Sequence, residues 1–97
     1  MCRKEIFAGI IEEVAHAAET TPSVILSRCR TAEAVDARCA FVRIASEQGY
    51  YPTQIAAFMG RTAASVRYLL TASVCREQTC KQFANILKTV RKQLANN

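Results

Sequence analysis

The sequence predicts an all-α fold of about six helices. Three features of the 97-residue chain lead to this prediction. Gly and Pro, at three and two residues, are too scarce to interrupt long elements often. Apolar residues make up 51% of the chain, which suits one folded domain with one core. Strong helix formers dominate, and runs of β-branched residues are few. We therefore expect residues 1–97 to form a single helical domain.

Apolar spacing and capping residues predict the first three helices. An apolar face recurs at helical spacing over residues 3–18. Pro22 suits the first turn of a short second helix, because its missing N–H lies where a helix has no acceptor for it. Thr31 can cap a long third helix over residues 32–47. The broad apolar face of this helix predicts that it is the central one of the domain.

Residues 53–72 are typical of a helix-turn-helix. Thr53 can cap the first helix, and Gly60 lies where that helix must stop, since Gly accepts a positive φ at little cost. Thr62 can cap the second helix. In this motif the second helix enters the DNA major groove with its N-terminal residues at the base edges. The alternative is an ordinary helical hairpin within a bundle.

The last helix is expected over residues 76–95, after the second motif helix closes over residues 71–74. Its apolar residues alternate in spacing between three and four: Cys80, Phe83, Leu87, Val90 and Leu94. This seam either covers the domain's own core or pairs with a second copy of the chain, in which case the protein is a homodimer. The outer face carries cations that we expect to be mostly solvated: Lys81, Lys88, Arg91 and Lys92.

Positive charge is concentrated in the second half of the chain. Residues 1–47 hold six Lys/Arg and seven Asp/Glu, a balance of −1, whereas residues 48–97 hold seven Lys/Arg and one acid, a balance of +6. The two sum to the net charge of +5. Such a surface suits double-stranded DNA as a partner, because each neutralised phosphate releases condensed counterions. A basic protein without a polyanion partner is the alternative.

Residues that can donate to phosphates or base edges are the candidate DNA contacts. On the motif, the residues expected to face the major groove are Arg61, Thr62, Ser65 and Arg67, and Thr53 and Gln54 are expected to meet phosphates. Arg28 and Arg30 lie in a polar connector before the long helix, where they either reach a phosphate or the minor groove or are simply solvated. The full set of candidates is Arg28, Arg30, Arg38, Thr53, Gln54, Arg61, Thr62, Ala63, Ser65 and Arg67.

Several functional classes find no support in the sequence. There is no P-loop, no dinucleotide-binding glycine motif and no set of catalytic side chains, so we expect no enzyme activity, cofactor or small-molecule substrate. The single histidine, His16, is expected at the surface. Five cysteines without a C-x-x-C pair predict reduced thiols in a cytoplasm and no metal site. No apolar run approaches the ~18 residues of a membrane span.

The order of elements over residues 6–74 resembles the C-terminal DNA-binding domain of the bacterial replication initiator DnaA, a member of the Trp-repressor-like group. The residues that carry the resemblance are Val24-Ile25-Leu26-Ser27-Arg28-Cys29-Arg30, Arg38, Ile55-Ala56-Ala57-Phe58-Met59-Gly60-Arg61 and Ser65-Val66. The resemblance implies that Arg30 enters the minor groove and that Arg61 and Ser65 belong to the DNA-contacting helix. It also implies a bacterial protein in DNA replication or transcription regulation.

The chain departs from the DnaA pattern at the residues that read bases. The family's Asp-His-Thr is replaced by Thr62-Ala63-Ala64, and two basic positions become Ala32 and Asp36. The ATPase part of an initiator is absent from this chain. Ala63 and Ala64 retain methyl groups that can contact a thymine methyl. The leading hypothesis is therefore double-stranded DNA binding, expected to be sequence-specific, without ATPase activity. The alternative is a helical protein–protein interaction module that keeps the fold but has lost DNA reading.

Overall fold

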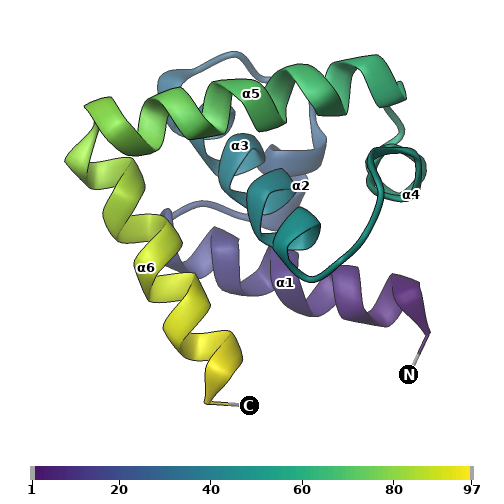
Figure 1. Ribbon diagram of the computed structural model, residues 1–97, viewed down its shortest axis with the longest axis horizontal. Coiled ribbons are helices and arrows are strands. Elements are labelled where there is room, and N and C mark those ends of the chain that lie inside the picture. Colours follow the sequence, from purple (N-terminus) through teal and green to yellow (C-terminus); the bar gives the residue numbers. More distant parts are fainter. Residues whose placement is uncertain (1, 97) are drawn as a thin grey trace.

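The computed structural model describes residues 2–96, and this part of the chain contains helices and no strand. The helices, shown in Figure 1, are α1 (Arg3–Ala17), α2 (Pro22–Leu26), α3 (Ala32–Glu47), α4 (Pro52–Met59), α5 (Ala63–Thr79) and α6 (Lys81–Ala95). The all-α prediction is confirmed. In that figure α5 and α1 run along opposite edges of the molecule, α3 lies between them, and α6 descends from the end of α5 towards α1.

Helix α3 is the centre of the core, as its broad apolar face predicts. Phe41, Val42 and Ile44 are fully buried, and α3 packs against each of the other five helices. The ring of Phe7 on α1 lies edge-on to Phe41, with ring centroids 6.1 Å apart, and 5.3 Å from the ring of Phe58 on α4. These contacts join the N-terminal helix to the predicted motif through the centre of the domain.

Local signals account for four of the helix ends. The Oγ1 atom of Thr31 accepts from the Ala34 N–H at 3.3 Å, so α3 begins where its cap predicts. Pro22 stands in the first turn of α2. Gly60 ends α4 in the left-handed conformation, with φ 68° and ψ 34°. The Thr62 Oγ1 atom then accepts from the Ser65 N–H at 3.1 Å at the start of α5. All four signals are confirmed.

The prediction that Thr53 caps the first motif helix is wrong. The cap and the start of helix α4 lie two residues earlier: Tyr51 occupies the capping position, and Pro52, whose fixed φ suits a first helical position, begins the helix. The Gln54 Oε1 atom accepts from the Tyr51 N–H at 2.8 Å and so satisfies one of the free donors at this end. The proline therefore decides the start of the helix.

The predicted end of the second motif helix is also wrong. Helix α5 continues through residues 71–74 to Thr79, and α6 begins at Lys81 rather than residue 76. The polar residues in this stretch bond to their own helix: the Thr71 hydroxyl donates to the Arg67 carbonyl at 3.1 Å, and the Ser73 hydroxyl donates to the Leu70 carbonyl at 2.6 Å. Ser73 is fully buried, so packing keeps this stretch helical.

The apolar seam of α6 covers the core of its own chain, which is one of the two alternatives that the sequence left open. Phe83 and Leu87 are fully buried and Val90 is 1% exposed. Helix α6 packs mainly on α1, with further contacts to α3 and α5. No helix in residues 2–96 has both the length and the apolar character that a membrane crossing needs.

Candidate nucleic-acid interface

The connector between α2 and α3 is held in place by a buried arginine. Arg38 on α3 is only 4% exposed, although arginine is rarely buried without partners. Its Nε atom donates to the Ile25 carbonyl at 2.8 Å, and its Nη2 atom donates to the carbonyls of Ser27 at 2.7 Å and Val24 at 3.2 Å. Burial, and then the charge of the nearby Arg61, lower the pKa of Arg38 below its usual value. Arg38 thus fixes the connector, and only a small part of its side chain reaches the hollow between the connector and α5 that it helps to line.

A second arginine joins the same connector to the turn between α4 and α5. The Nη2 atom of Arg61, in the turn between α4 and α5, also donates to the Ser27 carbonyl, at 3.0 Å. One main-chain oxygen therefore accepts from Arg38 and from Arg61. Because the connector, α3 and the turn meet at this atom, the arginines that follow Ser27 lie beside the start of α5.

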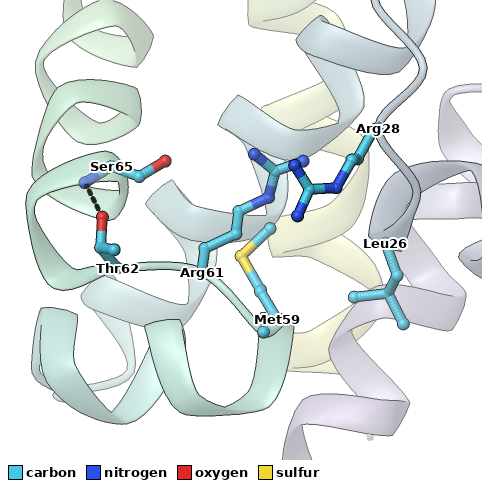
Figure 2. A pocket seen from close by; sticks show the side chains of 7 residues that line it. Leu26, Arg28, Met59, Arg61, Thr62 and Ser65 are labelled. Atoms are coloured by element: carbon cyan, nitrogen blue, oxygen red, sulfur yellow. Dashed lines mark hydrogen bonds between the residues drawn. The ribbon is translucent and has the colours of Figure 1, made fainter.

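Arg28, Arg30, Arg61, Ser65 and Tyr68 line two adjoining hollows, and we call these five residues the arginine surface. One hollow, of about 280 Å³, lies between the connector and the turn, and the other, of about 410 Å³, lies between the connector and α5. Figure 2 shows the side chains of Arg28 and Arg61 extending towards one another in the first hollow, with the Thr62–Ser65 cap beside them. Neither hollow is lined by an acidic residue.

Ion pairs divide the arginines of the protein into two groups. Arg43 and Arg91 pair with Glu47 and Glu77 at distances of 2.6 to 3.5 Å, where α3, α5 and α6 meet. Arg76 pairs with Asp36 nearby. Within residues 2–96 the arginines of the arginine surface form no ion pair, and neither does Arg67. The unpaired arginines of the connector and of the turn therefore lie together beside the start of α5, while other unpaired cations, such as Arg3 and Lys4, lie elsewhere.

The exposed face of α5 continues the arginine surface along the helix. Ala64, Arg67, Tyr68 and Thr71 are all exposed and recur at helical spacing, while Val66 on the opposite side is fully buried. Tyr68 is 74% exposed. The face thus presents one cation, a phenol, a hydroxyl and a methyl group to solvent.

The structure separates two of the predicted contacts from the others. Thr53 is exposed on α4, outside both hollows. Gln54 lines a different depression, next to α1, and its Oε1 atom is engaged with the Tyr51 N–H. Ala63 is half-buried at the start of α5. The predicted residues that line the two hollows are thus Arg28, Arg30, Arg38, Arg61, Thr62 and Ser65.

Sequence reasoning missed Tyr68 as part of this surface. Its position three residues after Ser65 and one after Arg67 on the outer side of α5 was the available signal. Cys29 was also passed over: it is exposed within the connector, and hydrogen bonds from Thr31, the backbone first, lower the pKa of its thiol. In residues 2–96 no group of three or more His, Cys, Asp or Glu side chains is placed to hold a metal ion.

No protein-family model matches the chain, and no curated protein matches it.

Proposed function

We propose that the protein binds double-stranded DNA through the arginine surface and the exposed face of α5, without ATPase activity. The observation that carries this proposal is the convergence of Arg28, Arg30 and Arg61. They come from two distant segments, line adjoining hollows and have no carboxylate partner within residues 2–96. Guanidinium groups that gather without a carboxylate partner are suited to the phosphates of a polyanion.

The arrangement also supports a mode of binding. With the N-terminal part of α5 in the major groove, Thr62, Ser65 and Arg67 would lie near base edges, and Ala64 would offer its methyl group to a thymine. Arg28 and Arg30 would then meet the adjacent backbone or minor groove. This placement is the one that the resemblance to the DnaA domain implies, and recognition of a specific sequence in a bacterial cytoplasm is part of the proposal. The five free thiols favour that reducing location.

A helical protein–protein interaction module is the second candidate function. The observation that favours it is the exposure of two tyrosines, Tyr51 at 69% and Tyr68 at 74%, because tyrosine is enriched at protein interfaces. The alanines at positions 63 and 64, where DnaA carries polar residues, point the same way. Binding through such a surface depends little on salt, whereas phosphate contacts impose a steep salt dependence.

The test is a fluorescence-anisotropy titration with a random-sequence duplex across a salt series. We compare the wild type with the double variant Arg28→Ala/Arg30→Ala. The variant is expected to weaken binding at least tenfold at low salt and to reduce the slope of log K against log salt by about 1 for each phosphate that it no longer neutralises. Sequencing of the duplexes that are retained then gives the site.

The matched control is Lys88→Ala/Lys92→Ala, which removes the same charge from exposed positions of α6 that line none of the hollows at the arginine surface. This control is expected to keep the salt slope of the wild type. Equal losses of affinity in the two double variants would mean that only the net charge of the protein matters. If the wild type did not bind the duplex at low salt, the proposal would be overturned in favour of a protein partner.

A further inference from the structure

A groove on another side of α4 carries chemistry unlike that of the arginine surface. It lies between the start of α1, the end of α2 and α4, and its volume is about 720 Å³. Figure 1 shows α4 above the N-terminal half of α1 at the same end of the molecule. The lining side chains that matter here are Arg3, Lys4, Phe7, Leu26, Ala57 and Phe58.

The floor of the groove is apolar and already formed. Leu26 is 38% exposed and is one of the few large apolar side chains that reach solvent. Phe58 is half-buried, and its ring packs against Phe7, which is only 1% exposed. Since Phe7 in turn lies 4.8 Å from the ring of Tyr50, the aromatic base of the groove is supported from below. An apolar partner would thus remove exposed surface from water without rearranging the core.

The rim of the groove is cationic. Arg3 and Lys4 are exposed, form no ion pair within residues 2–96, and share the groove with no carboxylate. The carboxylates of α1 lie elsewhere: Glu5, Glu12 and Glu13 line a separate hollow with Leu94 of α6. Helix α1 therefore turns positive charge towards the groove and negative charge away from it.

We propose that this groove binds a short acidic amphipathic helix of a partner protein. Two or three apolar side chains at helical spacing would rest on Leu26, Ala57 and Phe58, as in other complexes where a helix occupies a groove. Carboxylates beside them would face Arg3 and Lys4, which speeds association and disfavours basic partners. DNA does not fit this site, because it offers no comparable row of apolar anchors.

The proposal does not depend on DNA binding. The groove shares only Leu26 with the smaller hollow of the arginine surface and nothing with the larger one. Because the two sites have almost no residues in common, failure of one test leaves the other proposal intact.

The experiment uses a fluorescent 16-residue model peptide with Leu and Phe at positions i, i+4 and i+7 and Glu at most others. A second peptide replaces every Glu by Lys, and a third is a scramble of the first. Binding is followed by anisotropy, and ¹H–¹⁵N spectra of the protein locate the site. We expect the acidic peptide to bind most tightly and to shift the amides of Arg3, Lys4, Leu26 and Ala57.

Two variants of the protein complete the design. Ala57→Glu places a carboxylate in the groove at an exposed helical position and is expected to weaken binding of the acidic peptide at least tenfold. Ala8→Glu makes the same change at an exposed position of α1 outside the groove and is expected to have no effect.

Equal affinity of the wild type and Ala57→Glu would overturn the proposal, as would preference for the Lys peptide or amide shifts outside the groove. If the same amides shift with protein concentration in the absence of peptide, a second copy of the chain occupies the groove, and the proposal is equally overturned.

Discussion

At the scale of single residues, the structure depends on charged side chains that bond to the main chain. Arg38 makes no ion pair within residues 2–96 and instead donates to three carbonyl groups around the end of α2. A buried guanidinium is tolerated when its donors are satisfied. Its removal leaves the Ile25 carbonyl without a donor, whereas the Ser27 carbonyl keeps Arg61 and the Val24 carbonyl keeps the N–H and hydroxyl of Ser27. Arg38 thus connects the central helix to the connector that carries Arg28 and Arg30.

Arg38→Met is expected to lower the free energy of unfolding by about 1–3 kcal/mol, since it keeps much of the side-chain volume but leaves the Ile25 carbonyl without a donor. Urea denaturation measures the change. Arg38→Lys is the matched variant: it keeps the charge but cannot reproduce the planar fork of donors, so its loss of stability should be intermediate. Stability equal to the wild type in Arg38→Met would show that these hydrogen bonds contribute nothing.

At the scale of elements, α5 combines two tasks in one continuous helix. Its first turns carry Ser65, Arg67 and Tyr68 beside the connector, and its last turns bring Arg76 and Glu77 into ion pairs with other helices. Over its 17 residues it packs chiefly against α3 and α4. The ion pairs at the C-terminal end of α5 therefore help to fix the position of the proposed DNA-contacting end.

The variant Val74→Pro tests whether α5 is continuous or closes at residues 71–74. Val74 is 47% exposed, so its side chain contributes little packing. Val74→Pro should cost about 3 kcal/mol or more, because proline in a helix interior removes a hydrogen bond and clashes with the preceding turn. Unfolding free energies measured alongside far-ultraviolet circular dichroism give the result.

Val74→Ala is the control for that change and is expected to stay within ~0.5 kcal/mol of the wild type, as is usual for exposed positions. If the proline variant were as stable as this control, the helix would not be continuous through residue 74.

At the scale of the whole molecule, the charges are sorted by location. The cluster of Arg43, Glu47, Glu77 and Arg91 joins α3, α5 and α6, whereas the arginine surface at the start of α5 has no carboxylates. Hydrogen bonds from Arg91, and then the charges of Arg91 and Arg43, hold the pKa of Glu47 below its usual value of 4.5.

This lowered pKa predicts how stability depends on pH. Below the usual pKa, Glu47 in the unfolded chain takes up a proton that the folded chain still excludes, so the unfolded state binds more protons and stability rises with pH. The contribution of Glu47 is thus fully present above its usual pKa and is lost as the pH falls through the lowered one. Urea denaturation from about pH 6 to about pH 3 should show that Glu47→Gln is less stable than the wild type at the upper end and converges with it at the lower end. Parallel stability curves would contradict this role.

Local signals made most of the fold predictable from the sequence. Thr31, Gly60 and Thr62 act within three or four residues of their own positions, and the helix ends that they predict are confirmed. The end of α5 depends instead on burial of Ser73 against distant helices, which no local signal contains. The start of α4 also had a local signal, because Pro52 favours a first helical position. The prediction instead chose Thr53 as the capping residue.

The candidate site was predictable in part. The motif and the connector each supplied the arginines that the structure brings together, because their residue types and positions are visible in the sequence. The burial of Arg38 was not, since its acceptors lie eleven to fourteen residues away and meet it only when α2 folds onto α3. A charged residue on the margin of a helical face is compatible with either outcome until the neighbouring helices are placed.

The Ser27 carbonyl, which accepts from both Arg38 and Arg61, has a consequence for how this protein tolerates substitution. The acceptor is a main-chain oxygen, and every amino acid at position 27 supplies one. Substitution there removes the hydroxyl bonds to Val24 and Cys29 but leaves the meeting point of the two guanidinium groups in place. A scan of single substitutions would therefore detect the two donors, Arg38 and Arg61, but not the acceptor. Only replacement of the peptide bond that follows Ser27 by an ester, whose carbonyl is a weaker acceptor, would reveal what this acceptor contributes to stability.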